Sequence, residues 1–445
     1  MSFRPRQAIP LVNQLQPVNM ESIFLLCVLL LLILGGAPIG FTLILIPFFY
    51  ILVTDAVPLV LIPSQMFSAI DSVPLTAIAF FMLTGELMTS ATITDRLVAL
   101  SRALIGRLRG GLAQVNVLVS MFFAGMNGSV VADTATVGAL VLPAMKRAGY
   151  PAAFSAAVTG VSSTIGGIIP PSIMMIVLAN ATEISVAALF AAGIIPGILV
   201  GIVIMLINHY YALKFNFERS DESFSIKRVG QELYRSSFAL LIPVVLVGSV
   251  MGGVASVVEA GAITASVALF TGIFVYRTIK VKECASAFRR AFRNSAMVFI
   301  IIAASGPFSW LLTSLGAISD LENWLLSMVD SPILFIFALM LFIFLLGTVM
   351  DSAVNIIIVG PVLVDVMAKA GFPEVQAAVV VIVGFLIGSV TPPVGVAYFT
   401  SATIAEVRLE KVAVALVPYL IGLFLLLFFI ITVPELTMFL PDVMQ

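Results

Sequence analysis

Long apolar runs alternate with short polar segments along almost the whole chain. A helix needs about 20 residues to cross the roughly 30 Å of hydrocarbon in a bilayer, and most of these runs approach that length. The pattern therefore predicts an all-α polytopic membrane protein with about ten to twelve crossings. The runs cover residues 23–53, 74–90, 111–126, 152–180, 186–208, 236–251, 256–276, 295–313, 332–350, 353–367, 375–391 and 412–433.

Two stretches, 209–235 and 277–293, interrupt this pattern with mixed charges. Both are predicted to be amphipathic connectors on the membrane surface with no fold of their own. The first is interpreted as a cytoplasmic connector between a first repeat at 22–208 and a second repeat at 236–435. Residues 1–21 and 436–445 are predicted to be terminal tails. The run from Ile23 is predicted to be a retained first span and not a cleaved signal peptide.

The division into repeats comes from a faint internal match at an offset of 222 residues. Glycine and proline decide backbone shape, so a match dominated by them indicates two halves with one fold. Secondary transporters are commonly built from two structural repeats, with the substrate site where the repeats meet. The matched positions are Gly125 with Gly347, Gly138 with Gly360, Gly166 with Gly388, Pro170-Pro171 with Pro392-Pro393, and Pro196 with Pro418.

Composition agrees with a membrane protein and excludes several other classes. Hydrophobic residues make up 61% of the chain and charged residues 10%, and the mean hydropathy is +1.18, outside the range of soluble domains. A net charge of −1 gives no reason to expect nucleic acid, and two distant cysteines make neither a disulfide framework nor a zinc site. Without a Ser/His pair, an HExxH motif or paired aspartates in a Gly-rich setting, an intramembrane enzyme is not expected.

Basic residues gather in three segments, 96–109, 214–235 and 277–293, which the positive-inside rule places in the cytoplasm. The repeat counterpart of 96–109 is about 318–331, which holds Asp320, Glu322 and Asp330 and no Lys or Arg. Equivalent loops are therefore predicted to face opposite sides of the membrane. This makes the repeat inverted, with a pseudo-two-fold axis in the membrane plane.

In each repeat a cluster of small and hydroxyl residues, at 125–134 and 347–355, is followed about 40 residues later by a Pro-Pro pair. A Pro-Pro pair removes two backbone donors, so a helix must break there. The freed carbonyls, with Ser, Thr and Asn oxygens, suit a desolvated Na⁺, and the following half-helix N-termini suit an anionic group. We predict two such sites, one per repeat. Occluded sites of this kind favour a carrier over a channel with a continuous pore.

Five ionisable residues within or beside apolar runs have to be assigned roles. Asp133 and Asp351 are expensive in hydrocarbon and are functional candidates by default. Asp351 is the stronger of the two, because Asp133 is equally explained as a packing acid bonded to a neighbouring threonine. Glu86 and Glu259 are explained equally well by scaffold packing and by gating. His209, the sole histidine, lies at a membrane edge, so a histidine proton relay is not expected.

Several short motifs occur in order along the chain: Gly85-Glu86-Leu87-Met88, Arg107-Leu108-Arg109-Gly110-Gly111-Leu112, Gly128-Ser129, Ala132-Asp133, Leu142-Pro143-Ala144-Met145, Ile168-Ile169-Pro170-Pro171-Ser172, Pro196-Gly197 and Thr391-Pro392-Pro393-Val394-Gly395. Through these motifs the chain, from about residue 22 to 435, resembles the large membrane subunit of tripartite ATP-independent periplasmic (TRAP) transporters. The two Pro-Pro motifs in their context are the most specific part of this resemblance.

The resemblance implies an elevator-type carrier, in which a transport domain with two re-entrant helical hairpins, about 111–197 and 332–418, moves against a scaffold domain. It implies Na⁺-coupled import of an organic acid across the bacterial inner membrane. It also implies two partners: a small TRAP membrane subunit, encoded separately, and a soluble periplasmic substrate-binding protein. The alternative is a stand-alone Na⁺-coupled anion or dicarboxylate symporter of the same broad fold. Neither hypothesis distinguishes a C4-dicarboxylate from a sugar acid, such as sialic acid, or a keto acid.

The resemblance also implies a set of site residues, carried over motif by motif. The family usually has Ser where this chain has Asn127, so the first Na⁺ site would use an amide oxygen there. A common Thr-Pro-Thr-Glu-Ala stands here as Ser256-Val257-Val258-Glu259-Ala260, which concerns the scaffold more than the site. The implied residues are Asn127, Gly166, Ile169 and Pro171 for the first Na⁺; Gly347, Thr348, Gly388, Thr391 and Pro393 for the second Na⁺; and Ser129, Ser172 and Asp351 for the substrate.

Overall fold

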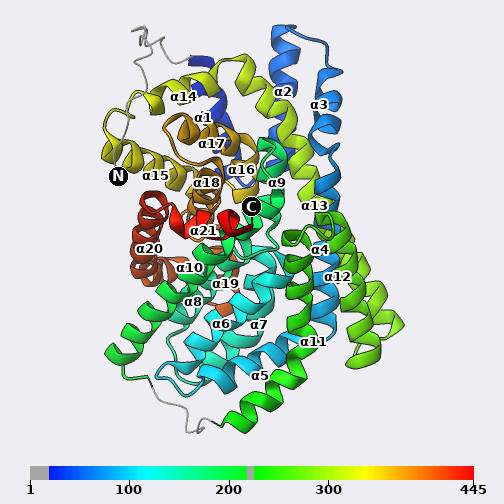
Figure 1. Cartoon of the computed structure of the whole chain (residues 1–445). Helices are drawn as coiled ribbons and strands as arrows, with labels where there is room; N and C mark the ends of the chain where they lie inside the picture. Colours follow the sequence, from blue (N-terminus) through cyan, green and yellow to red (C-terminus); the bar gives the residue numbers. More distant parts are fainter. Residues whose placement is uncertain (1–19, 218–224, 445) are drawn as a thin grey trace.

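The computed structural model describes residues 20–217 and 225–444, and these residues form helices joined by short turns, with no strand among them (Figure 1). In the described part of the chain, seven helices are long and apolar enough to cross a membrane, and an eighth crossing results if one bent pair counts as a span. The pattern predicted about ten to twelve crossings. The number of long apolar helices is smaller because several apolar runs break into shorter helices. The seven spans are Val73–Ser90, Val186–Lys214, Ile226–Met251, Val257–Val275, Val281–Ser314, Pro332–Val349 and Leu409–Thr432.

The first apolar run is one of those that break. The single span predicted from Ile23 onward is instead two shorter helices, α1 (Met20–Leu34) and α2 (Ile39–Thr54). The turn between them contains Gly36, whose φ of 87° is left-handed, and Pro38, which caps α2. A glycine adopts that backbone conformation at little cost, and a proline cannot continue a preceding helix. Residues 1–19 of the predicted N-terminal tail lie outside the described residues.

In their described residues the two polar stretches are largely helical, so the prediction that they have no fold of their own is wrong there, while the role of 209–235 as the connector between the repeats stays a prediction. The ends of 209–235 extend α10 (Val186–Lys214) and open α11 (Ile226–Met251), while most of 277–293 opens α13 (Val281–Ser314). At 1.5 Å per residue, the 34 residues of α13 span about 51 Å, so its charged part extends beyond the hydrocarbon. The predicted C-terminal tail likewise belongs to α21 (Glu435–Met444), which packs against α10 and buries Thr437 and Pro441.

Five helices of the first repeat have counterparts in the second. Each counterpart begins within one residue of the position that an offset of 222 residues gives. One pair differs in shape, because the counterpart of α7 is bent by 53° between two short helices, the second of which has Pro361 in its first turn. The pairs are α6 (Gly111–Asn127) with α15 (Pro332–Val349), α7 (Val130–Arg147) with α16 (Ser352–Ile358) and α17 (Gly360–Lys369), α8 (Ala152–Ser163) with α18 (Glu374–Gly388), α9 (Ile173–Thr182) with α19 (Val396–Ala405), and α10 with α20 (Leu409–Thr432).

The helices form two bodies, which we call the slab and the bundle (Figure 1). The slab consists of α2, α3 (Leu61–Ile70), α4 (Val73–Ser90), α11, α12 (Val257–Phe270) and α13, with the short π-helix η2 (Thr271–Val275). The bundle consists of α6–α10, η1 (Thr164–Gly167) and α15–α20. Two amphipathic helices, α5 (Ile93–Ile105) and α14 (Ala317–Leu326), link the bodies. The division into a scaffold domain and a transport domain, and their relative motion, stay predictions.

The three basic segments gather at one end of the molecule. The Arg96 guanidinium lies over the Tyr276 ring, 3.9 Å from its centre, and the Tyr276 hydroxyl donates to the Arg235 carbonyl at 3.0 Å. Arg96 and Arg235 belong to the first and second basic segments, and Tyr276 borders the third. We call this the basic end. Helix α5 lies at this end and its repeat counterpart α14 at the other (Figure 1), as an inverted repeat requires.

Candidate functional site

The first predicted site lies where the α6–α7 turn meets the break between α8 and α9. Gly128, in the turn, has a φ of 62°, and its carbonyl accepts a hydrogen bond from the Ile173 amide at 3.3 Å. A Cβ on Gly128 would lie 2.4 Å from the Pro171 carbonyl oxygen, so only glycine allows this approach. A Cβ on Gly166 would lie 3.4 Å from the Ser129 carbonyl oxygen. The structure therefore brings the predicted first-site segments, 127–129 and 166–172, together.

Helix α6 and helix α7 make the hairpin, and the Pro-Pro break belongs to the next pair, α8 and α9. Both outer ends of α6 and α7 are near the basic end: Gly110 packs against Ala212, and the Tyr150 ring lies 4.5 Å from the Phe217 ring. The predicted hairpin of about 111–197 therefore contains two separate features: the turn between α6 and α7 and the break between α8 and α9. Whether α6 and α7 enter and leave the membrane on one side stays a prediction.

The Asn127 side chain stabilises the α6–α7 turn and keeps part of its hydrogen-bonding capacity unused. It is buried, and its Oδ1 accepts from the Ser129 amide at 2.9 Å. Its Nδ2 has no partner within the described residues. An amide oxygen has two lone pairs, so Oδ1 retains one that could coordinate a cation.

Asp133 is the residue whose surroundings fit a cation best. It is fully buried and packs against Gly166, with Ser120 donating to its Oδ2 at 2.8 Å. Its Oδ1 has no partner within the described residues. A buried carboxylate oxygen without a partner is costly unless a proton or a cation compensates it. The sequence identified Asp133 as a candidate but ranked it below Asp351, since only the structure shows the unpaired oxygen.

The second predicted site repeats this arrangement between the α15–α16 turn and the break after α18. Gly347 and Gly388 pack backbone to backbone, and a Cβ on Gly388 would lie 2.4 Å from the Gly347 Cα. The Val394 amide donates to the Thr348 carbonyl at 3.1 Å, which ties the turn to the segment after the Pro-Pro pair. The predicted residues Gly347, Thr348, Gly388, Thr391 and Pro393 thus lie in two adjoining segments.

The hydroxyls of the second site face the backbone of their own helices. Thr348 Oγ1 donates to the Leu345 carbonyl at 2.8 Å, and Thr391 Oγ1 donates to the Ile387 carbonyl at 2.9 Å. Each oxygen therefore keeps its lone pairs for another partner. Asn355, the repeat counterpart of Asp133, uses its Nδ2 to donate to the Leu346 and Met350 carbonyls, at 3.2 and 3.3 Å. Its buried Oδ1 has no partner within the described residues, as with Oδ1 of Asp133.

The three predicted substrate residues are all helix N-caps. Ser129 Oγ accepts from the Ala132 amide at 3.4 Å at the start of α7, and Ser172 Oγ accepts from the Met175 amide at 3.3 Å at the start of α9. Asp351, the repeat counterpart of Ser129, accepts from the Ala353 amide at 2.9 Å. The two serines lie at the first site and Asp351 at the second, and no direct contact between Asp351 and either serine is found in the described residues.

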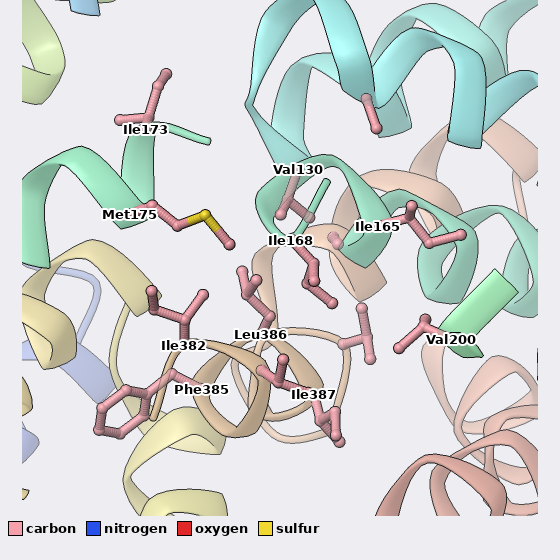
Figure 2. Close-up of a cluster of buried hydrophobic side chains, with 14 of the residues drawn as sticks. Val130, Ile165, Ile168, Ile173, Met175, Val200, Ile382, Phe385, Leu386 and Ile387 are labelled. Atoms are coloured by element: carbon pink, nitrogen blue, oxygen red, sulfur yellow. The ribbon is translucent and has the colours of Figure 1, made fainter. Parts of the chain in front are cut away.

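An apolar layer separates the two breaks. Leu386 of α18 lies between Val130 and Ile168 of the first repeat and Phe385 and Ile387 of the second (Figure 2). A Cβ on Gly167 would lie 2.6 Å from Leu386 Cδ1, so the second repeat packs directly against the 3-10 turn of the first. Apolar side chains of both repeats therefore pack between the two breaks.

The other candidate acids have structural roles. Glu86 of α4 accepts from Arg290 Nε at 2.6 Å and from Asn294 Nδ2 at 3.0 Å, which fixes α4 to α13 within the slab. Glu259 forms a capping box with Ser256 at the start of α12, at an exposed position. His209 is exposed near the end of α10. These contacts favour the scaffold-packing interpretation for both glutamates.

Comparison with known proteins gives a consistent family. Residues 26–436 match the family model described as "Tripartite ATP-independent periplasmic transporter, DctM component". A putative TRAP transporter large permease protein of Haemophilus influenzae is 33% identical over 423 residues, covering 94% of this chain and 98% of that protein. The sialic acid TRAP transporter large permease protein of Vibrio cholerae is 29% identical, covering 92% of this chain and 96% of that protein.

Two further relatives extend the comparison. The 2,3-diketo-L-gulonate TRAP transporter large permease protein of Escherichia coli is 31% identical, covering 90% of this chain and 94% of that protein. Among solved structures, the YdaH transporter of Alcanivorax borkumensis is similar in fold, with a TM-score of 0.56 and 15% identity, covering 83% of this chain and 86% of that one.

Proposed function

Because the chain belongs to the family of tripartite ATP-independent periplasmic transporters, as their DctM component, we propose that it imports an organic acid by coupling to Na⁺. Membership makes it a large permease of the inner membrane and a secondary transporter of organic acids, not an enzyme. The proposal adds the driving ion, the two ion sites and the partners: a small membrane subunit and a periplasmic substrate-binding protein that delivers the acid.

One observation carries the Na⁺ proposal: each repeat presents an unpaired, buried oxygen beside a break in a helix. These are Oδ1 of Asp133 and Oδ1 of Asn355, at equivalent positions. Na⁺ is a hard cation that binds oxygen, and backbone carbonyls freed at a broken helix supply further ligands. Asn127, Gly166, Ile169 and Pro171 would complete the first site, and Gly347, Thr348, Gly388, Thr391 and Pro393 the second.

Substrate binding is proposed at the N-termini of two helices of the first repeat: α7, which begins after the α6–α7 turn, and α9, which begins after the Pro-Pro break. The N-termini of α7 and α9 carry partial positive charge, which favours a carboxylate. Ser129 and Ser172 cap these helices and would add hydroxyl contacts, while Asp351 would contact hydroxyl or amide groups of the acid. The acids named for the relatives, sialic acid, C4-dicarboxylates and 2,3-diketo-L-gulonate, are the first candidates.

The test is uptake of labelled succinate, N-acetylneuraminate and 2,3-diketo-L-gulonate into proteoliposomes, with and without an inward Na⁺ gradient. Each condition is run with this chain alone, and again with a small TRAP membrane subunit and a periplasmic substrate-binding protein added. Uptake that needs Na⁺ and both partners supports the proposal. Na⁺-driven uptake by the chain alone would favour the stand-alone symporter, and uptake that ignores Na⁺ would refute the coupling.

A further inference from the structure

A cavity of about 300 Å³ lies where α1, α13 and α14 meet α15, α16 and α17. Its walls include Leu312 of α13 and Ile318 of α14. Ile358 and Val359, at the bend between α16 and α17, also line it. The first-repeat counterpart of that bent pair, α7, is one continuous helix. The cavity therefore adjoins a backbone feature that the first repeat lacks.

The cavity opens toward the lipid. Ile23 and Leu26 of α1 and Trp324 of α14 border it, and they are 43%, 37% and 43% exposed. Helix α14 lies at the end opposite the basic end (Figure 1), the side predicted to face the periplasm. Exposed tryptophan is enriched where hydrocarbon meets lipid headgroups. The mouth of the cavity is therefore at the level where a phospholipid changes from acyl chain to headgroup.

One polar group in the cavity wall has no partner. Ser22 of α1 is 2% exposed, and its Oγ makes no hydrogen bond within the described residues. Apart from Ser22, Asp320 and the Trp324 indole, the lining side chains are apolar. A buried hydroxyl without a partner is costly, so a ligand that supplies an acceptor is favoured. The cavity thus suits a ligand with a long apolar part and an oxygen close to Ser22.

Acidic side chains prevail around the mouth. Asp320 lines the cavity, and Glu21 lies in the first turn of α1. Glu322 of α14 and Asp365 of α17 both pair with Lys369, so this lysine does not offset the other acids. Like charges repel and opposite charges attract across short distances. A ligand with an ammonium group is therefore favoured at the mouth over one with a net negative charge.

We propose that this cavity binds a bilayer phospholipid with a primary ammonium headgroup, of the phosphatidylethanolamine type. One acyl chain fills the apolar part, an ester oxygen accepts from Ser22 Oγ, and the ammonium group lies near Asp320. A bilayer lipid is the occupant because the mouth faces hydrocarbon, where acyl chains are always present. Binding of this lipid does not depend on the proposed transport function.

The bound lipid also stabilises the turn of the second predicted Na⁺ site. Leu346 and Met350 line the cavity, and their carbonyls accept from Asn355 Nδ2 at 3.2 and 3.3 Å. Oδ1 of Asn355 is the unpaired oxygen proposed to bind Na⁺. An acyl chain packed against Leu346 and Met350 restricts this turn and strengthens Na⁺ binding there. This consequence, unlike the binding itself, rests on the proposed function.

Native mass spectrometry of the detergent-solubilised chain tests the site. The protein is stripped of lipid and titrated with phosphatidylethanolamine, phosphatidylcholine or phosphatidylglycerol of the same chain length. We expect one tightly held phosphatidylethanolamine, with each of the other two held several-fold more weakly. Equal retention of the three lipids, or retention of none, would overturn the proposal.

Three variants locate the bound lipid. Ala317→Phe fills the cavity and should abolish retention. Ser22→Ala removes only the hydroxyl and should weaken retention by about fivefold, the loss of one hydrogen bond. Val417→Phe is the matched control, because it fills a groove of about 590 Å³ between α15 and α20 that is lined by apolar residues. Retention that survives both Ala317→Phe and Ser22→Ala, or that is lost in Val417→Phe, would contradict the assignment.

The small membrane subunit is the other candidate for this surface. Adding that subunit to the lipid-bound chain should leave the count of bound phosphatidylethanolamine unchanged. Release of the lipid would show that a protein helix takes the cavity in the assembled transporter, and the proposal would then be wrong.

Uptake tests the link to the second site. Phosphatidylethanolamine in proteoliposomes is replaced by phosphatidylcholine at a constant fraction of phosphatidylglycerol, so that the surface charge is unchanged. The Na⁺ concentration for half-maximal uptake should rise by about fivefold in the parent and stay constant in Ala317→Phe. An unchanged value in the parent would exclude the link. A parent without Na⁺-driven uptake would instead contradict the proposed function, while the lipid counts stay interpretable.

Discussion

Asp133 and Asn355 occupy equivalent positions in the two repeats, yet one is an acid and the other an amide. Both side chains are buried, and both keep one oxygen without a partner. A Na⁺ at the first site would therefore be neutralised by a carboxylate, and a Na⁺ at the second only by dipoles. This difference in charge makes the two proposed sites unequal in affinity, with the first the tighter.

We expect Asp133→Asn to weaken Na⁺ binding by about tenfold, equivalent to about 1.4 kcal/mol, because the anionic oxygen is lost while the shape is kept. The measurement is the Na⁺ concentration that gives half-maximal uptake. Glu259→Gln is the matched control, since that glutamate is exposed and caps α12. An unchanged Na⁺ dependence in Asp133→Asn would indicate that Asp133 is a packing acid, the alternative that the sequence left open.

Thr391 gives a sharper test of the second site. Its hydroxyl donates to the Ile387 carbonyl and leaves the oxygen available to a cation. Thr391→Ala should abolish uptake with normal membrane insertion, whereas Thr391→Ser should retain most of it, because the oxygen is kept. Equal uptake by the two variants would exclude the Thr391 side chain from the site. Insertion is checked by size-exclusion chromatography of the solubilised protein.

Among elements, α15 and α18 approach each other closely at Gly347 and Gly388. A Cβ on Gly388 would lie 2.4 Å from a backbone atom that cannot move without shifting the turn. We expect Gly388→Ala to cost roughly 1–3 kcal/mol of stability through overpacking. The melting temperature in detergent measures this. Gly248→Ala in α11, where a Cβ meets nothing within 4 Å, should leave that temperature unchanged or slightly raised. A Gly388→Ala protein as stable as Gly248→Ala would contradict the tight approach.

The element scale also shows what the sequence could predict. The Pro-Pro pairs predicted both breaks, because two missing amide donors stop a helix in any context. They could not show that each break packs on the turn of the preceding hairpin, since that turn depends on single glycines such as Gly128. Ser129, Ser172 and Asp351 were predicted as ligands from resemblance, while their capping of α7, α9 and α16 needed helix boundaries that a continuous apolar pattern hides.

Crossing number was predicted least well, for a related reason. Hydropathy measures the apolar length of a run, and a run such as 152–180 carries no charged residue although it holds α8, η1 and α9. Charged stretches were assigned to surface connectors because charge is costly in hydrocarbon. Helix α13, however, is longer than the hydrocarbon is thick, and its charged residues lie in the part that extends beyond it. The repeat offset, which depends on backbone residues, was the more reliable guide to the fold.

At the scale of the whole molecule, the inverted repeat rests on charge and on the opposite placement of α5 and α14 (Figure 1). Leu108 and Asp330 are repeat counterparts, both exposed, next to these two helices. In a background with both native cysteines replaced, Cys27→Ser and Cys284→Ser, Leu108→Cys should react with an impermeant thiol reagent only in inside-out vesicles. Asp330→Cys should react only in right-side-out vesicles, because its loop lacks Lys and Arg and is predicted to face the periplasm. Reaction of both from the same side would mean that the repeats run in parallel, which contradicts the predicted pseudo-two-fold axis in the membrane plane.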